Sequence, residues 1–366
     1  MQQKALEKIR SLGLPTRKSE DWHYFPVAKL AACKSLDFIG NASGLSSINA
    51  AEKSANPPRG AFDETDFGIE NETDFSALLP IAMGAKCFFK EIAPCAKESG
   101  ILKAHDEFSH SAFRIGAKAK VSLEILENKL SRALSAERLD FFVGEDAELE
   151  LFFSEEGHGE ELKFRNIRIH QEKGSKVHVL DFNRSSALWR FDIQTSLLGE
   201  AAEFGFRALN ILNGSADGNG FVRVAHLAPQ CKSRQFVRNL LSDNATLSYD
   251  GGVTAAPLCP GTDSSELINT MLLSDEAKIQ VKPTLKIYHD DVACSHGNTV
   301  GALDAESIFY LQSRGIAQER AKELLLRAFA KELLAEHPNE ETARRFAKLL
   351  DSLHFNGGVF PAAERA

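Results

Sequence analysis

Two residues that can bind metal lie two positions apart near the C-terminal end of the chain, Cys294 and His296. A thiolate and an imidazole are both ligands for iron, zinc or copper. In extended backbone this spacing puts both side chains on one face, with Cα atoms about 6 to 7 Å apart. Two ligands are too few for a closed site. A metal bound here would therefore need further ligands from a second chain.

The same segment also has a purely structural interpretation. The LKIY run that ends at Tyr288 alternates like a strand, and Asp304 and Gly315 suit the start and the end of a helix. In that case Cys294 is a buried thiol and His296 a hydrogen-bonded imidazole in a strand-to-helix corner. The residue types alone favour this structural interpretation.

Asp290 and Asp291 precede this pair and offer two carboxylates. Paired carboxylates can perform acid–base chemistry. Adjacent acids at the end of a strand are more often turn residues that accept backbone N–H bonds, and within a strand they point to opposite faces. We therefore favour a structural role for both, together with the flexible Gly297.

One pattern recurs through the middle of the chain, at irregular intervals of roughly thirty residues. In each copy a small residue follows an acidic or glycine turn, and a short run of alternating apolar residues comes next. Short strands at this spacing predict a solenoid, and a β-sandwich is the alternative because hairpins would use the same strands. The copies are EDAELELFF (145–153), KGSKVHVLDF (173–182), EAAEFGFRAL (200–209), DNATLSYDG (243–251) and DEAKIQVKP (275–283), with Leu149, Leu151, Val177, Val179, Phe204, Phe206, Ile279 and Val281 facing inward.

We expect three regions: a helical and irregular region over 1–95, a β core over 96–300 and a helical domain over 301–366. Residues 41–60 are rich in Ala, Ser, Asn and Pro, which is typical of a linker. The last region changes to helical spacing, with apolar residues at Leu324, Leu325, Ala328, Phe329 and Leu333.

Composition limits the classes of function. The formal net charge is −8 over 366 residues, which argues against binding to nucleic acid or an anionic membrane surface. No apolar run reaches the length of a spanning helix, and the first ten residues do not resemble a secretion signal. The six cysteines form no C-x-x-C pair, so we expect reduced thiols in a cytoplasmic protein. No G-x-x-x-x-G-K-[ST] motif occurs, so we expect no ATP hydrolysis by a P-loop.

A second motif lies near the N-terminus, with Arg17, Glu20, Asp21, Trp22 and Tyr24 inside PTRKSEDWHYFPV. Our interpretation is an aromatic plug, in which Trp22 and Tyr24 bury area while Arg17 pairs with Glu20 or Asp21. A role in binding a cofactor or a partner is the alternative.

The stretch from about Ala277 to Leu334 resembles the C-terminal signature of the SufB/SufD family of iron–sulfur cluster assembly scaffolds. KPTLKIY before the Cys-Ser-His-Gly core and the RGI run after it carry the resemblance, and the N-terminal Arg-x-x-Glu-Asp-Trp-x-Tyr segment also matches. Within the family the chain resembles the SufD branch, since it lacks the Glu-His-Glu-Ala and the extra cysteines of the SufB branch. One departure is Asn298, where the family usually has Ala.

This resemblance implies a mainly β protein, with a right-handed parallel β-helix core flanked by N-terminal and C-terminal helical domains. It implies a non-catalytic scaffold subunit that pairs with SufB through the last turns of the β-helix and docks the SufC ATPase on its C-terminal helices, at Leu324, Leu325 and Phe329. The isolated chain would form a homodimer.

The resemblance also places His296, as ligand or proton handler, at the SufB contact, with Cys294 as a neighbour or auxiliary ligand. There a nascent iron–sulfur cluster would be held transiently and iron would enter. The isolated chain would hold no stable cofactor, and a flavin is associated with the assembled complex.

Two other functions are compatible with the sequence. A structural adaptor would bind the same partners and never touch metal. A β-helix polysaccharide lyase or hydrolase would need paired carboxylates or a basic cluster on one solenoid face, and Asp290 and Asp291 are the nearest match.

Overall fold

The computed structural model describes residues 1–31, 36, 67–103, 106–126, 134–157, 161–185, 187–334 and 339–353. The linker predicted over 41–60 lies outside these residues.

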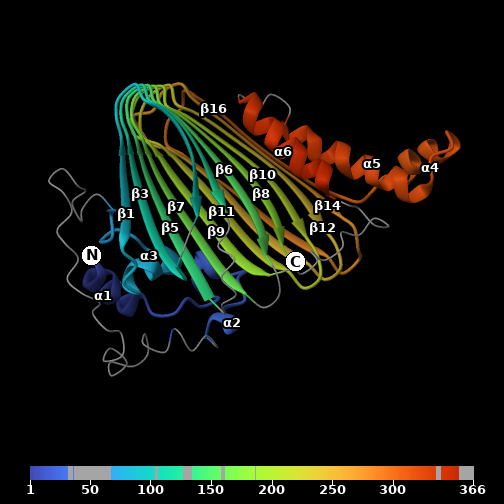
Figure 1. The fold of residues 1–366 in the computed structure, drawn as a ribbon, viewed down its shortest axis with the longest axis horizontal. Coiled ribbons are helices and arrows are strands. Elements are labelled where there is room, and N and C mark those ends of the chain that lie inside the picture. Colours follow the sequence, from blue (N-terminus) through green and yellow to red (C-terminus); the bar gives the residue numbers. More distant parts are fainter. Residues whose placement is uncertain are drawn as a thin grey trace.

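The core is a parallel β-solenoid made of two sheets, and the chain crosses from one to the other at each step (Figure 1). Neighbouring strands within each sheet pair in parallel and in register. Residues that stack in register are 23 to 32 positions apart, as in Cys87–His110 and Thr246–Lys278. This confirms the predicted solenoid and excludes the sandwich of hairpins.

The first sheet contains the odd-numbered strands: β1 (Cys87–Ile92), β3 (Phe108–Ile115), β5 (Leu134–Val143), β7 (Leu162–Gln171), β9 (Leu188–Leu197), β11 (Asp217–His226), β13 (Thr246–Ala255) and β15 (Lys278–Ile287). The second sheet contains the even-numbered strands: β2 (Lys97–Lys103), β4 (Lys120–Leu126), β6 (Glu148–Gly157), β8 (Lys176–Ser185), β10 (Glu203–Leu212), β12 (Lys232–Leu241), β14 (Thr262–Leu272) and β16 (Val292–Gly301). β15 and β16 are the end strands of the two sheets.

The space between the sheets is filled by alternate residues of each strand, as expected for a period of two. Six of the eight residues predicted to face inward are buried there, and the other two are half-buried and pack against the same core: Leu149, Leu151, Val177, Val179, Phe204 and Phe206, then Ile279 and Val281. The alternation in sequence therefore identified the inner face.

The turns explain the small residue of each copy. Asp146, Gly174 and Ala201 adopt left-handed backbone, with φ of 55°, 63° and 59°. Each is followed by a fully buried small residue, Ala147 and Ala202 among them, where the chain bends back into the solenoid. Short side chains fit this bend because the neighbouring turns stack closely there.

The N-terminal elements cover the outer face of the first sheet: α1 (Gln2–Leu12), the 3₁₀ turn η1 (Glu20–Trp22), α2 (Val27–Ala31) and α3 (Phe75–Ala82). Buried residues of α1 and α3 form one apolar cluster with outward-facing residues of the sheet, including Ala112, Phe164 and Leu188. The N-terminal helices therefore pack onto the sheet and share a second apolar core with it.

Three C-terminal elements cover the outer face of the second sheet: α5 (Gln318–Lys331), η5 (Glu332–Leu334) and α6 (Glu340–Ser352), while α4 (Ala305–Ser313) projects beyond it. Leu326, Ala330 and Phe346 are buried against Leu180 and Leu209 of the sheet. By contrast α4 buries none of its residues, and Phe309 and Tyr310 are 71% and 58% exposed. Asp304 caps α4 as predicted, with its carboxylate accepting from the Ser307 N–H at 2.9 Å.

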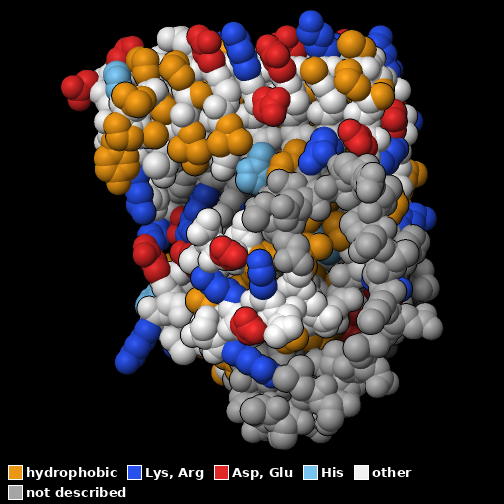
Figure 2. All heavy atoms as spheres, turned by 90° about the vertical axis from the view of Figure 1, so that its left-hand side faces the viewer, with side chains coloured by type: hydrophobic (Ala, Val, Ile, Leu, Met, Phe, Trp, Pro, Cys, Tyr) orange, Lys and Arg blue, Asp and Glu red, His pale blue; other side chains and the backbone are white. Residues whose placement is uncertain are grey.

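The surface carries both signs of charge. On the face that Figure 2 shows, hydrophobic side chains gather in the upper part, and acidic and basic side chains are interspersed along the rim and in the lower half. Such a mixed face does not favour a polyanion. Within the described ranges, no helix is both long and apolar enough to cross a bilayer.

Candidate functional site

Cys294 and His296 lie in the middle of β16, at the open end of the second sheet. The expectation of a strand-to-helix corner was wrong, because β16 continues to Gly301 and α4 begins only at Ala305. In register, Cys294 pairs with Ser264 and His296 with Glu266 of β14. Both therefore belong to the inward-facing set of their strand, as the two-residue spacing predicted.

The end position leaves His296 exposed and Cys294 half-buried. Burial, followed by the carboxylate of Asp263, raises the pKa of the Cys294 thiol, so the thiol form is favoured in the absence of a metal. A cation brought to this face would shift the balance toward the thiolate.

Glu266, the register partner of His296 on β14, is 3% exposed. Burial raises the pKa of its carboxyl to about 7, and the nearby Asp250 carboxylate adds to this effect. Neither carboxylate oxygen accepts a hydrogen bond from any described residue. Glu266 lies outside the motifs that the sequence displays. A Glu at an inward-facing strand position was the available signal.

From Ser264 of β14, the register partner of Cys294, a hydrogen-bonded chain of polar groups leads into the protein. The Oγ atoms of Ser264 and Ser233 are 2.8 Å apart, and Nε2 of His226 lies 2.9 Å from the Ser233 Oγ. Burial lowers the pKa of His226 to about 4, so this imidazole is neutral at pH 7.

This end of the solenoid does not contain a complete metal site by itself. Across the parts of the chain that the structure describes, no group of three or more His, Cys, Asp and Glu side chains converges to hold a metal ion. The described cysteines are all free thiols. Cys294 and His296 therefore offer at most part of a ligand set.

Asp290 and Asp291 lie in the turn between β15 and β16. The carbonyl of Asp291 accepts from the Gly261 N–H at 2.8 Å, and that of Asp290 accepts from the Val292 N–H at 3.1 Å. Gly297 lies within β16, where an added Cβ would touch the side chain of Leu267 at 3.3 Å. Asp290 and Asp291 therefore lie in a turn as expected, and the structural roles of their carboxylates and of Gly297 stay a prediction.

The N-terminal motif is built differently from the prediction. Trp22 is buried, but Tyr24 is 45% exposed, so only one aromatic residue acts as the plug. Glu20 pairs with Lys282 at 2.8 Å, and Asp21 pairs with Arg223 at 2.6 Å, so the pairing of Arg17 with these acids was wrong. The cations that pair with these two acids come from strands far away in the sequence.

Trp22 lies on a buried charge network that is not visible in the sequence. The Arg190 guanidinium stacks 4.2 Å from the Trp22 ring and pairs with Asp74 at 2.7 Å. Arg190 is 1% exposed and also donates to the Asp21 carbonyl. Burial would raise the pKa of Asp21, but the bonds and charge of Arg223 outweigh it and lower the pKa. The network joins the N-terminal segment to the solenoid.

The residues predicted to dock an ATPase lie on α5. Leu324 and Leu325 are half-buried, and Leu324 lines a surface hollow between α5 and α6. Phe329 packs against the sheet cluster, and the Arg238 guanidinium lies 4.5 Å from its ring. Leu324 is therefore open to a partner, whereas Phe329 mainly fixes α5 to the solenoid.

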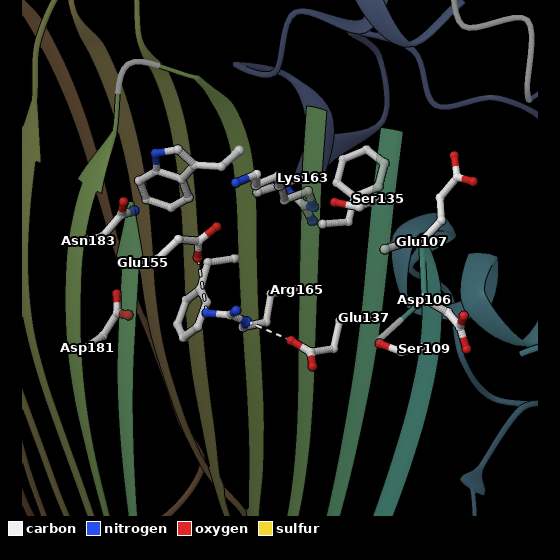
Figure 3. Close-up of a pocket in the computed structure, with 15 residues that line it drawn as sticks. Asp106, Glu107, Ser109, Ser135, Glu137, Glu155, Lys163, Arg165, Asp181 and Asn183 are labelled. Carbon is white, nitrogen blue, oxygen red and sulfur yellow. Dashed lines mark hydrogen bonds and ion pairs between the residues drawn. The ribbon is translucent and has the colours of Figure 1, made fainter. Parts of the chain in front are cut away.

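A second polar cluster lies inside the solenoid, between the sheets (Figure 3). Arg165 donates to Glu137 and Glu155 at 2.9 and 3.0 Å, beside a cavity of about 40 Å³. Burial raises the pKa of Asp181 there to about 7 and lowers that of Lys163 to about 8. A cavity of this size has room for ordered water but not for a sugar.

Comparison with known proteins agrees with this fold. The family described as "SUF system FeS cluster assembly, SufBD core domain" matches residues 101–329. The iron–sulfur cluster assembly protein SufD of Escherichia coli is 27% identical over 378 residues, which cover 90% of this chain and 87% of that protein. A SufBD family protein of Synechocystis is 31% identical over 199 residues, or 54% of this chain and 44% of the relative's length.

The chain therefore belongs to the SufBD family of iron–sulfur cluster assembly proteins. Within the family it is similar to SufD over most of its length.

Proposed function

We propose that this protein is a non-catalytic scaffold subunit that pairs with a SufB-type subunit through the β15–β16 end of its solenoid. The observation that carries the proposal is the place of Cys294 and His296 on the end strand β16, one half-buried and one exposed. An end strand presents backbone groups to which a second chain can add a strand. A partner that docks there would meet the thiol and the imidazole.

In this arrangement an iron–sulfur cluster under assembly is the cargo at the interface and not a resident cofactor. His296 would bind iron or handle a proton, and Cys294 would be a neighbour or auxiliary ligand. The partner would supply the remaining ligands, since a closed site needs about four. This division fits the incomplete ligand set of the single chain.

A SufC-type ATPase would dock on the C-terminal helices. Support comes from α4, which exposes Phe309 and Tyr310, and from the half-exposed Leu324 and Leu325 of α5. Exposed apolar side chains on adjoining helices suit a protein partner. ATP hydrolysis would then belong to that subunit, in the cytoplasm, and a flavin would bind in the assembled complex.

Co-purification of the chain with SufB-type and SufC-type subunits tests the proposal, followed by anaerobic measurement of iron and sulfide. His296→Ala should leave the complex intact and remove most of the bound iron and sulfide. Ser295→Ala is the matched control, because Ser295 is the exposed neighbour whose side chain belongs to the opposite face of β16. Unchanged cluster content in His296→Ala would make the chain an adaptor, and failure of the wild-type complex to form would refute the pairing.

A further inference from the structure

The inner face of the second sheet changes character in its last turns. One in-register column runs Leu123, Leu151, Val179, Phe206 and then Gln235, Glu266 and His296. Its first four members are apolar and its last three are polar. The change begins two strands before the end, so solvent exposure at the end strand does not explain it: Gln235 and Glu266 are 2% and 3% exposed.

The neighbouring column changes at the same strand. It runs Val121, Leu149, Val177, Phe204 and then Ser233, Ser264 and Cys294. Ser233 bonds to Ser264 and to Nε2 of His226, so both serine hydroxyls of this column have a partner. Each of the two metal-capable residues on β16 therefore continues a column with polar residues on β12 and β14. In the column of His296, the side-chain polar atoms of Gln235 and Glu266 have no hydrogen-bond partner among the described residues.

Glu266 places a buried carboxylate in this column, and neither of its oxygens accepts a hydrogen bond from a described residue. Its carboxylate occupies the space over Gly251 of β13, where an added Cβ would overlap it. A buried carboxylate with no hydrogen-bond partner lowers stability, and such groups are kept where activity requires them. Packing alone would favour an apolar residue, as at Val179 and Phe206 in the same column.

We infer that Glu266 is a positioning residue for His296. Its carboxylate would turn from its place over Gly251 toward β16 and accept the second ring N–H of this imidazole when the other ring nitrogen binds metal. A histidine that ligates a metal almost always donates its other N–H to a carboxylate, a carbonyl or water, which fixes the tautomer and the ring orientation. Glu266 and His296 are direct neighbours in register on one face, with Cα atoms about 5 Å apart. The inference rests on the proposed role of His296 as a ligand.

The test uses the complete complex, freed of iron, and Co²⁺ as the probe metal. Glu266→Gln should weaken Co²⁺ binding about 10- to 100-fold and change the visible absorption bands of the bound ion. Complex formation should not change, and the melting temperature should stay the same or rise, because an unpaired buried charge is removed. Glu266→Asp, which retains a carboxylate, should bind Co²⁺ more tightly than Glu266→Gln.

The matched control is Asp181→Asn, since Asp181 is another buried carboxyl on the inner face of this sheet, far from β16. It should leave Co²⁺ binding unchanged. Wild-type affinity in Glu266→Gln would overturn the inference, and so would a fall in melting temperature together with the loss of metal, which indicates a structural role. Should Glu266→Gln fail to fold, the apolar Glu266→Met takes its place with the same expected loss.

The two proposals fail in different ways. If His296→Ala keeps wild-type iron and sulfide, the metal role of His296 is refuted, and the role of Glu266 is refuted with it. If His296→Ala loses them while Glu266→Gln binds Co²⁺ like the wild type, only the role of Glu266 is refuted.

Discussion

Stability should depend less on pH after Asp181→Asn than in the unchanged protein. Asp181 is 4% exposed, and burial raises the pKa of its carboxyl to about 7, against the charge of Arg165. The folded protein keeps this proton at pH values where the unfolded chain has lost it. The unchanged protein therefore loses stability as the pH rises from the unfolded-state value of 3.8 through about 7.

The size of the effect follows from the two pKa values. One pKa unit corresponds to about 1.4 kcal/mol. Between pH 5 and pH 8 the Asp181 carboxyl is ionised throughout in the unfolded chain, whereas in the folded protein it changes from the protonated to the ionised form. Over this range the free energy of unfolding should fall by about 3 kcal/mol because of Asp181 alone. Asparagine does not titrate, so this contribution disappears in Asp181→Asn.

Urea unfolding followed by circular dichroism at pH 5 and pH 8 measures the effect. The change in the free energy of unfolding between pH 5 and pH 8 is measured for both proteins. Subtracting the change in the variant from that in the unchanged protein cancels the contributions of the other titrating groups. Asp275→Asn, at an exposed position, is the control and should leave the pH difference unchanged. If Asp181→Asn and the unchanged protein lose the same stability between pH 5 and pH 8, the carboxyl is already ionised in the folded protein and the reasoning is wrong.

Three further sets of substitutions test the packing by urea unfolding. Leu326→Ala should lower the free energy of unfolding by about 2 to 5 kcal/mol, because Leu326 is fully buried. Leu324 is only half-buried, so Leu324→Ala should lower it by less. Equal losses would contradict the placement of α5. Gly251→Ala should lower the free energy of unfolding by about 1 to 3 kcal/mol, because the added Cβ overlaps the Glu266 carboxylate. Adding Glu266→Ala should restore part of this loss. If the effects of the two substitutions simply add, the carboxylate does not lie over Gly251. Arg190→Met should cost about 3 to 5 kcal/mol because it leaves buried carboxylates uncompensated, and a neutral result would refute the buried network.

The solenoid could be predicted because its signal is local. Alternation of Val177 with Val179 and of Phe204 with Phe206 reports a period of two without knowledge of the partner strand. The assignment of strands to sheets was not local: the copies at 145–153, 173–182 and 200–209 enter the second sheet, whereas those at 243–251 and 275–283 enter the first. This change of sheet explains why the repeats looked irregular.

The candidate site was predictable in part for the same reason. The spacing of Cys294 and His296 fixes a shared face, but the strand beneath them is fixed only by pairing with β14, some thirty residues earlier. Glu266 was therefore not visible from the motif. The partners of Glu20 and Asp21 lie more than 200 residues away, and the nearer Arg17 was the wrong choice.

The N-terminal turn also sets an order of assembly. Asp21 and Glu20 bond to Arg190, Arg223 and Lys282, at sequence separations of 169, 202 and 262 residues. A solenoid can grow one turn after another while the chain is synthesised, since each turn needs only its neighbour. The N-terminal turn gains its last ion pair only when β15 is in place, beside the end where Cys294 and His296 lie. The N-terminal turn is thus fully attached only when the last turns of the solenoid are complete. A chain cut short before β15 would lack both the Glu20–Lys282 ion pair and the candidate site.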